Sequence, residues 1–166
     1  MGLEISTYQG TAGEAEGMIG LLKSIFVVEG YTDPIEAEKW LVPDLLQKRG
    51  IILVAKKDGG ETLGMVICVS PTSPLKKMAE KDEAEVHLLA VSPAARCQGL
   101  GSRLMEACEQ RAVLLGYFNM VLWTQPSMKA AQRLYEGLGY QRNPGRDWTQ
   151  GPKSYWVYEK KMKGEV

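Results

Sequence analysis

The sequence has few of the features that mark membrane, nucleic-acid-binding or metal-binding proteins. No apolar run approaches the roughly 18 residues that a membrane-spanning helix needs, and the first ten residues lack the cationic and apolar segments of a secretory signal. Twenty Lys and Arg balance twenty Asp and Glu, so no overall positive field attracts nucleic acid. The three cysteines, Cys68, Cys97 and Cys108, match neither a disulfide framework nor a metal-binding spacing. We therefore expect a cytoplasmic protein with no metal and with neither membrane nor nucleic-acid partners.

What the sequence does contain is a globular composition in which strand and helix patterns alternate. Its 166 residues, 45% of them apolar, suit one domain over residues 1–166 with a sizeable core. Period-two or β-rich patterns predict strands, and apolar residues at helical spacing predict helices. The predicted strands before the middle of the chain cover residues 3–8, 51–55 and 63–69, with a hairpin turn over 56–60.

The predicted helices of this first half have recognisable boundaries. Thr11, with Glu14 three residues later, resembles a capping box for a helix that reaches about residue 28. Asp33-Pro34 opens a second helical pattern, and Pro43 predicts a break in it. Residues 71–82 form a polar, proline-containing loop that is long enough to have a function.

A glycine-containing turn lies between a strand and a helix in the middle of the chain. The strand covers residues 85–91, the turn reads Arg96-Cys97-Gln98-Gly99-Leu100-Gly101-Ser102, and a helical pattern follows at once. Free N–H groups at such a helix start, together with the helix dipole, can hold a phosphate or pyrophosphate. No Gly-Lys-Ser/Thr follows, which excludes a P-loop, and Leu104 interrupts a dinucleotide-binding fingerprint. The turn alone is equally compatible with a helix start that binds no ligand.

The downstream sequence completes a pattern. Residues 118–124 predict a strand, and the helix after it ends in Ala131-Gln132-Arg133-Leu134-Tyr135-Glu136-Gly137-Leu138-Gly139-Tyr140. With the turn at 96–101, this segment resembles the GCN5-related N-acetyltransferase superfamily over residues 85–140. The resemblance implies a mixed α/β (α+β) fold. Its central, mostly antiparallel sheet is splayed and flanked by helices, which is the acyl-CoA N-acyltransferase fold.

The resemblance also implies where acetyl-CoA binds. The amides of Gln98, Gly99, Leu100, Gly101 and Ser102 would hold the pyrophosphate, in a motif that begins with Arg96 and Cys97. Exposed backbone at Leu89 and Val91 would pair with the pantetheine arm. The sequence departs from the family pattern at Cys97, which is acceptable there if its φ is negative, and at Met128, where many members carry Asn.

The chemistry of amine acetylation needs a proton acceptor and a proton donor. An amine with a pKa near 10.4 is neutral in only about one molecule in 10³ at pH 7, a deficit of roughly 4–5 kcal/mol. Glu85 matches the position of a catalytic glutamate in some members of the superfamily, although a solvated carboxylate is the alternative. His87 shares its strand face and is a second candidate base, or simply a packed histidine. Tyr135 matches the donor to the leaving thiolate, with core packing as the alternative.

The acceptor side carries no diagnostic pattern. Tyr31, Trp40, Lys76-Lys77 and the segment 146–148 are candidates to line it. We expect transfer of the acetyl group from acetyl-CoA to a primary amine, by direct attack in a ternary complex, with a small-molecule acceptor. Acetylation of a protein N-terminus or lysine, and acyl-CoA sensing without turnover, remain alternatives. Aromatic residues of the last predicted strand, such as Trp156 and Tyr158, suggest a possible homodimer.

Overall fold

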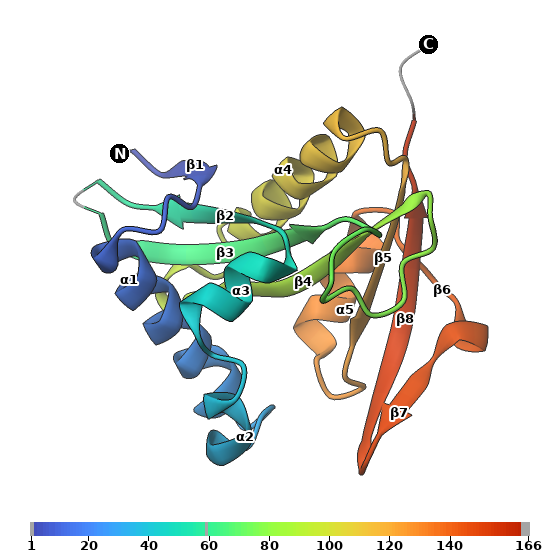
Figure 1. Cartoon of the computed structure of the whole chain (residues 1–166), viewed down its shortest axis with the longest axis horizontal. Coiled ribbons are helices and arrows are strands. Elements are labelled where there is room, and N and C mark those ends of the chain that lie inside the picture. Colours follow the sequence, from blue (N-terminus) through green and yellow to red (C-terminus); the bar gives the residue numbers. More distant parts are fainter. Residues whose placement is uncertain (1, 59, 164–166) are drawn as a thin grey trace.

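The computed structural model describes residues 2–58 and 60–163 (Figure 1). Its strands are β1 (Glu4–Thr7), β2 (Ile51–Lys56), β3 (Thr62–Val69), β4 (Glu83–Val91), β5 (Asn119–Thr124), β6 (Gln141–Arg142), β7 (Trp148–Gln150) and β8 (Lys153–Lys161). Its α-helices are α1 (Ala12–Leu22), α2 (Pro34–Glu38), α3 (Pro43–Arg49), α4 (Leu100–Leu114) and α5 (Lys129–Gly137). A π-helical turn, Lys23–Val27, continues α1, and short 3-10 turns cover Pro93–Ala95 and Pro144–Arg146.

The described strands form one eight-stranded sheet in the order β1-β2-β3-β4-β5-β8-β6, with β7 paired to β8. Neighbouring strands run antiparallel except β4 and β5, which are parallel. The predicted mixed, mostly antiparallel fold is therefore confirmed. Within the part of the chain that the structure describes, no helix is both long enough and apolar enough to span a bilayer.

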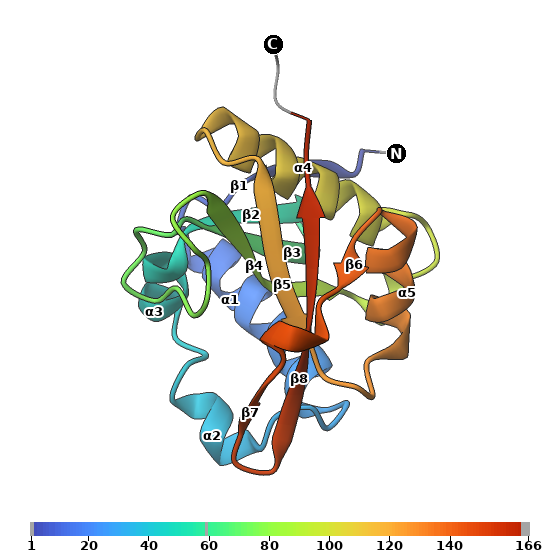
Figure 2. The ribbon, with the colours of Figure 1, turned by 90° about the vertical axis from the view of Figure 1, so that its right-hand side faces the viewer.

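Helices cover both faces of the sheet, because successive side chains of a strand point to opposite faces. On β3, Met65 and Ile67 pack in a cluster with α1 and α3, whereas Val66 and Cys68 pack in a larger cluster with α4 and α5. Figure 2 shows α1 and α4 on opposite sides of the strands. The sheet thus separates two hydrophobic clusters, one on each of its faces.

The N-terminal helices follow the predicted boundaries with local differences. The Thr11 hydroxyl accepts a hydrogen bond from the Glu14 amide, but the Glu14 carboxylate accepts from the Gln9 amide rather than from Thr11, so only half of the capping box forms. Pro43 starts α3 and separates it from α2, as predicted. The predicted turn at 56–60 joins β2 to β3 but includes Gly59, which lies outside the described residues.

Strands β4 and β5 pair only at their beginnings. Their register runs from Glu83 opposite Asn119 to Glu85 opposite Val121 and then stops. Leu88 has a φ of 53°, and the pairing of β4 with β3 shifts at this point, which makes a bulge. Bulges bend a strand and increase its twist. The remainder of β4 therefore separates from β5, which confirms the predicted splay.

Candidate functional site

Unpartnered backbone amides surround the start of α4. Gly99 is the N-cap with a φ of 77°, and no side chain caps the helix. Among the described residues, no acceptor takes the N–H groups of residues 97–102, and the first bond of the helix runs from the Arg103 amide to the Gly99 carbonyl. These amides and the dipole of a fifteen-residue helix form a suitable site for a diphosphate. A cradle of this kind fits the pyrophosphate of acetyl-CoA.

Cys97 takes a conformation that the sequence did not indicate. Its φ is 62°, in the left-handed region, so the condition under which a non-glycine residue is unstrained here is not met. A non-glycine residue held there costs of order 1–3 kcal/mol. The side chain is exposed, and the strained backbone bends the turn between Arg96 and Gly99.

Gly101 brings α4 close to α5. A Cβ at this position would lie 3.0 Å from Leu134 Cδ2, so a larger residue requires the Leu134 side chain to shift by a few tenths of an ångström. Tyr135 follows Leu134 on α5 and is 6% exposed. Its ring lies near those of Tyr140 and Tyr158, with centroids 5.9 and 6.1 Å away. Gly101 therefore lets the start of α4 pack against Leu134, the residue before Tyr135.

Burial raises the pKa of the Tyr135 phenol. Removal from water raises the pKa of its phenol far above its ordinary value, and nearby Cys108 adds to the effect. Within the described residues, its hydroxyl makes no hydrogen bond of normal geometry. Tyr135 therefore keeps its proton at neutral pH and can donate a hydrogen bond to developing negative charge.

The side chain of Arg96 turns away from the amide cradle. Its Nη2 lies 2.7 Å from Glu29 Oε2, in the segment that follows the π-helical turn, and its Nε donates to the Val91 carbonyl at 3.3 Å. The ion pair is partly exposed, so its net contribution to stability is small, about 0–1 kcal/mol. Both terminal nitrogens of Arg96 therefore face Glu29.

The backbone of Leu89 and Val91 faces the gap beside β5. The Ser92 amide donates to the Leu63 carbonyl on β3 at 2.8 Å. Because the N–H and C=O groups of consecutive strand residues point to alternate sides, those of Val91 and Leu89 turn away from β3. This edge of β4 has no partner on β5 beyond Glu85, so it can pair with an extended ligand, and the Val91 carbonyl at its end already accepts from Arg96 Nε.

Glu85 is fully buried rather than solvated. Its carboxylate accepts hydrogen bonds from the amides of Lys77, Met78 and Ala79, all in the loop after β3, and from His87 Nε2 at 2.6 Å. Burial by itself raises the pKa of Glu85, but these hydrogen bonds outweigh it and lower the pKa to about 2. A carboxylate with such a pKa is a weak proton acceptor at neutral pH.

His87 connects Glu85 to Arg49. The guanidinium of Arg49, at the end of α3, lies 3.0 Å from His87 Nδ1. Arginine only donates hydrogen bonds, so Nδ1 accepts and the proton belongs on Nε2, which donates to Glu85. Burial and Arg49 lower the pKa of His87 against the opposing effect of Glu85, and the ring is therefore neutral. Both of its nitrogens are engaged.

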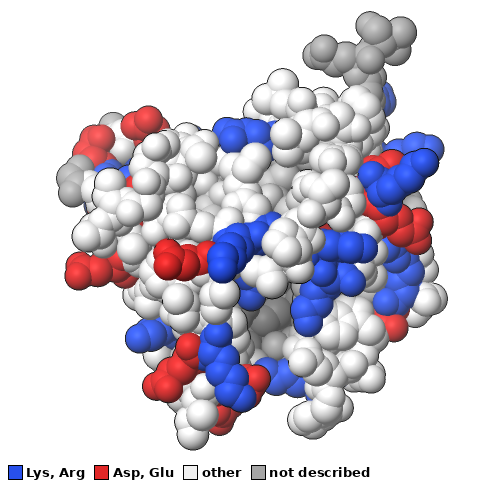
Figure 3. Space-filling model, in the orientation of Figure 1, with Lys and Arg blue, Asp and Glu red and all other residues white. Residues whose placement is uncertain are grey.

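Aromatic rings extend this network across the face of the sheet that α1 and α3 cover. Trp123 lies 5.1 Å from His87 and 5.7 Å from Trp148, which stacks on Tyr155 at 4.1 Å. Lys77 Nζ lies 4.9 Å from the Trp148 ring centre. Arg146, in contrast, is held by Glu83 and Glu159 and has a structural role. Figure 3 shows a hollow on this face, between the region around α2 and the β7–β8 hairpin.

Tyr31 connects the two sides of that hollow through its carbonyl oxygen. This oxygen accepts hydrogen bonds from Lys153 Nζ at 2.8 Å and from Gln125 Nε2 at 3.2 Å. Met128, where the family often has Asn, accepts a hydrogen bond from Thr124 through its sulfur. The sequence indicated neither contact, nor the role of Arg49, because each joins residues whose proximity depends on the fold.

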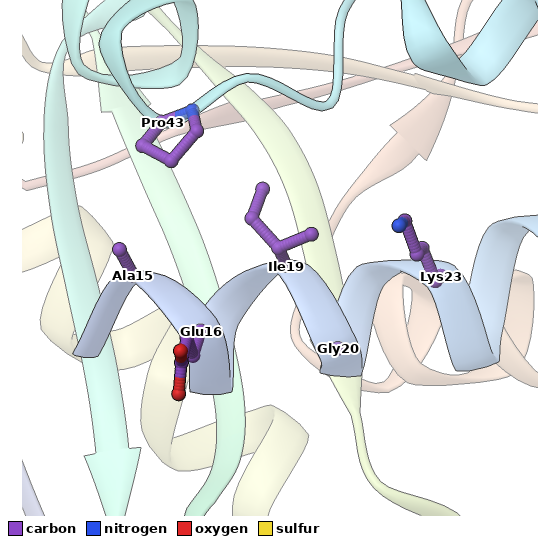
Figure 4. Close-up of a pocket in the computed structure, with 6 residues that line it drawn as sticks. All are labelled: Ala15, Glu16, Ile19, Gly20, Lys23 and Pro43. Atoms are coloured by element: carbon purple, nitrogen blue, oxygen red, sulfur yellow. The ribbon is translucent and has the colours of Figure 1, made fainter. Parts of the chain in front are cut away.

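A separate pocket of about 400 Å³ lies against α1. Figure 4 shows Pro43 facing Ala15 and Ile19 across it. None of the predicted site residues lines this pocket. In the described residues, no three His, Cys, Asp or Glu side chains are grouped to hold a metal ion.

The comparisons with known proteins agree with this geometry. The model of the acetyltransferase (GNAT) family matches residues 16–140. N-acetyltransferase family 8 members 3 and 7 of Mus musculus are each 34% identical over 83 residues, which are 50% of this chain and 35% of each relative. The matched part thus spans about a third of those relatives.

Solved structures share the fold over nearly the whole chain. An acetyltransferase from Streptococcus agalactiae has a TM-score of 0.77 at 18% identity and covers 98% of this chain and 99% of its own. The PaiA N-acetyltransferase of Thermoplasma acidophilum, solved in complex with coenzyme A, has a TM-score of 0.73 at 18% identity, with 98% and 100% covered. Together with the family match over residues 16–140, the splayed strands and the amide cradle establish that this chain belongs to the acetyltransferase (GNAT) family.

Proposed function

We propose that this protein transfers the acetyl group of acetyl-CoA to a primary amine of a small molecule, by direct attack in a ternary complex. Acetyl-CoA-dependent N-acetylation is general in the family to which the chain belongs. The observation that carries the proposal is the run of unpartnered amides at residues 97–102, beside the unpaired edge of β4. The amides would hold the diphosphate, and Leu89 and Val91 would align the pantetheine arm in the gap.

The chain's own groups divide the remaining work. Tyr135 would donate a hydrogen bond to the leaving thiolate, because its phenol is protonated at neutral pH. Full proton transfer from a phenol to a thiolate is uphill, by about 2 kcal/mol even with ordinary pKa values. Holding amine and thioester together would supply much of the remaining acceleration.

Glu85 would position the site instead of removing the proton. Its oxygens already accept from three amides and from His87, its pKa is low and it is fully buried, so it is a poor base for an incoming amine. Both nitrogens of His87 are occupied as well. We assign to Glu85 the task of holding residues 77–79 and His87 against β4. The acceptor amine would then lose its proton to solvent before attack.

A small acceptor suits the acceptor side better than a polypeptide does. Lys153 and Gln125 donate hydrogen bonds to the Tyr31 carbonyl and so join the β7–β8 hairpin and the loop after β5 to the segment between α1 and α2. These bonds bridge the acceptor side and narrow the space for an extended peptide. Peptide acetylation would require them to open.

Amine-dependent release of CoA thiol from acetyl-CoA tests the proposal. A panel of small primary amines is compared with lysine-containing peptides, in the wild type and in Tyr135→Phe. We expect Tyr135→Phe to lower turnover at least tenfold while CoA binding, measured by calorimetry, is retained.

Tyr140→Phe is the matched control, because it removes a phenol of the same cluster whose hydroxyl bonds to Glu109 at 2.7 Å. Its turnover should stay near that of the wild type. CoA binding without amine-dependent thiol release would support a sensor, and faster reaction with peptides would support a protein acetyltransferase. Either result would contradict the proposal.

A further inference from the structure

Arg49 lies on the acceptor side without a carboxylate partner. It is the last residue of α3, is half-buried, and donates to His87 Nδ1 at 3.0 Å. Its guanidinium carbon lies 5.7 Å from the centre of the Trp40 ring. Among the described residues, no Asp or Glu oxygen comes within 4 Å of it, and one of its five N–H donors is used.

Burying half of a charged guanidinium without a counter-ion costs free energy, and a bound anion would offset that cost. Burial lowers the pKa of Arg49, and Glu85, behind the His87 ring, only partly opposes this effect. The Glu85 charge is already satisfied by three loop amides and the His87 ring. The spare donors of Arg49 therefore remain available, in the planar fork that matches a carboxylate.

Two further cations on this side also lack carboxylate partners within the described chain. Lys77 Nζ lies over the Trp148 ring, and Lys153 Nζ donates a hydrogen bond to the Tyr31 carbonyl. Two of the nearby acidic groups are engaged elsewhere: Glu83 pairs with Arg146, and Glu29 pairs with Arg96. A chain with zero formal net charge thus has a local excess of positive charge here. Figure 3 shows Lys and Arg gathered in the middle of this face, over α3 and the loop after β3.

We propose that the acceptor amine carries a carboxylate and that Arg49 binds this carboxylate, an inference that rests on the acetyltransferase function proposed above. His87, the partner of Arg49, directly precedes the bulge at Leu88. Each strand residue advances the chain by about 3.3 Å, so the gap beside β4 begins close to His87. A carboxylate on Arg49 therefore lies within roughly 10 Å of the gap that receives the thioester. That span suits an amino acid or a small derivative of one. The adjacent Trp40 ring offers an apolar surface for its side chain.

Matched acceptors test this assignment. Each amino acid is compared with its carboxamide and with its decarboxylated amine, first by CoA release and then by calorimetric binding in the presence of CoA. The variants are Arg49→Gln, which removes the charge and the guanidinium fork, and Lys48→Gln, which removes the neighbouring exposed cation. A phosphorylated amine serves as the alternative anion.

We expect wild type and Lys48→Gln to prefer the amino acid by about tenfold to hundredfold in kcat/KM, the usual range for a charged hydrogen bond. Arg49→Gln should lose this preference through KM, so that its kcat/KM with the amino acid falls to its own kcat/KM with the decarboxylated amine. Equal use of all three acceptors, or a preference unchanged in Arg49→Gln, would overturn the assignment and leave the acetyltransferase function intact. Preference for the phosphorylated amine would overturn it as well.

Calorimetric binding tests the role of Arg49 even without turnover. If no acceptor releases CoA, the proposed function fails, but the carboxylate site can still be measured. Amino-acid binding that Arg49→Gln abolishes and Lys48→Gln retains supports the carboxylate site. Absence of amino-acid binding to the wild type contradicts it.

Discussion

Replacing Glu85 by Gln perturbs the most completely buried charge of the site while it preserves the side-chain shape. The carboxylate accepts hydrogen bonds from the amides of residues 77–79 and from His87, and each of these groups is a donor. A carboxamide offers one accepting oxygen and turns an NH₂ group toward the remaining donors. We therefore expect the loop after β3 to lose part of its attachment to β4.

The pKa of Glu85 sets the size of the effect. The hydrogen bonds outweigh burial and lower this pKa from 4.5 to about 2, which corresponds to about 3 kcal/mol at about 1.36 kcal/mol per pKa unit. Because the folded state binds this proton less tightly than the unfolded chain, the stabilisation is fully present above about pH 4.5. It is lost as the pH falls toward 2.

Denaturant unfolding at a series of pH values measures this effect. At pH 7, Glu85→Gln should unfold with a free energy about 3 kcal/mol below that of the wild type. The difference should shrink as the pH falls below 4.5. Glu80→Gln, in the same loop but exposed, is the control and should change little. A difference that stays the same at pH 7 and pH 3 would refute the reasoning, because the loss would then not depend on ionisation.

Three further predictions concern the cradle and the acceptor. Gly99→Val should lower the free energy of unfolding by about 1–3 kcal/mol through its left-handed backbone, and it should weaken CoA binding at least tenfold in calorimetry. Gly116→Val is the control, because Gly116 has a φ of 92° and, like Gly99, no atom within 4 Å of an added Cβ; it should lower the free energy of unfolding without weakening CoA binding. Undiminished CoA binding in Gly99→Val would rule out the cradle. Glu29→Gln should free Arg96 and tighten CoA binding severalfold, an effect no larger than that of a partly exposed ion pair; weaker binding would show that the pair supports the site. The rate at low acceptor concentration should rise about tenfold per pH unit up to the pKa of the acceptor amine, and a plateau below pH 7 would indicate an enzyme base instead.

Local features of the chain were predictable because they depend on the backbone conformation of neighbouring residues. The strand before residue 91, the turn at 96–101 and the helix from Leu100 follow from glycine positions and apolar periodicity. The break at Pro43 follows from the missing N–H of proline. The left-handed conformation of Cys97 was not predictable, because nothing in its residue type favours it.

The sequence by itself therefore determined the order of the elements from β1 to α5, including the helix start that can receive a diphosphate and the helix that carries Tyr135. Only the tertiary structure decided the state of the polar groups. The sequence left open whether Glu85 is a catalytic or a solvated carboxylate. In the structure it is buried and accepts hydrogen bonds from the amides of residues 77–79. Arg49 meets His87 across 38 positions, and Lys153 meets Tyr31 across 122. Burial and hydrogen-bond partners set the charge and reach of a side chain, and both arise from contacts between segments that are distant in the chain.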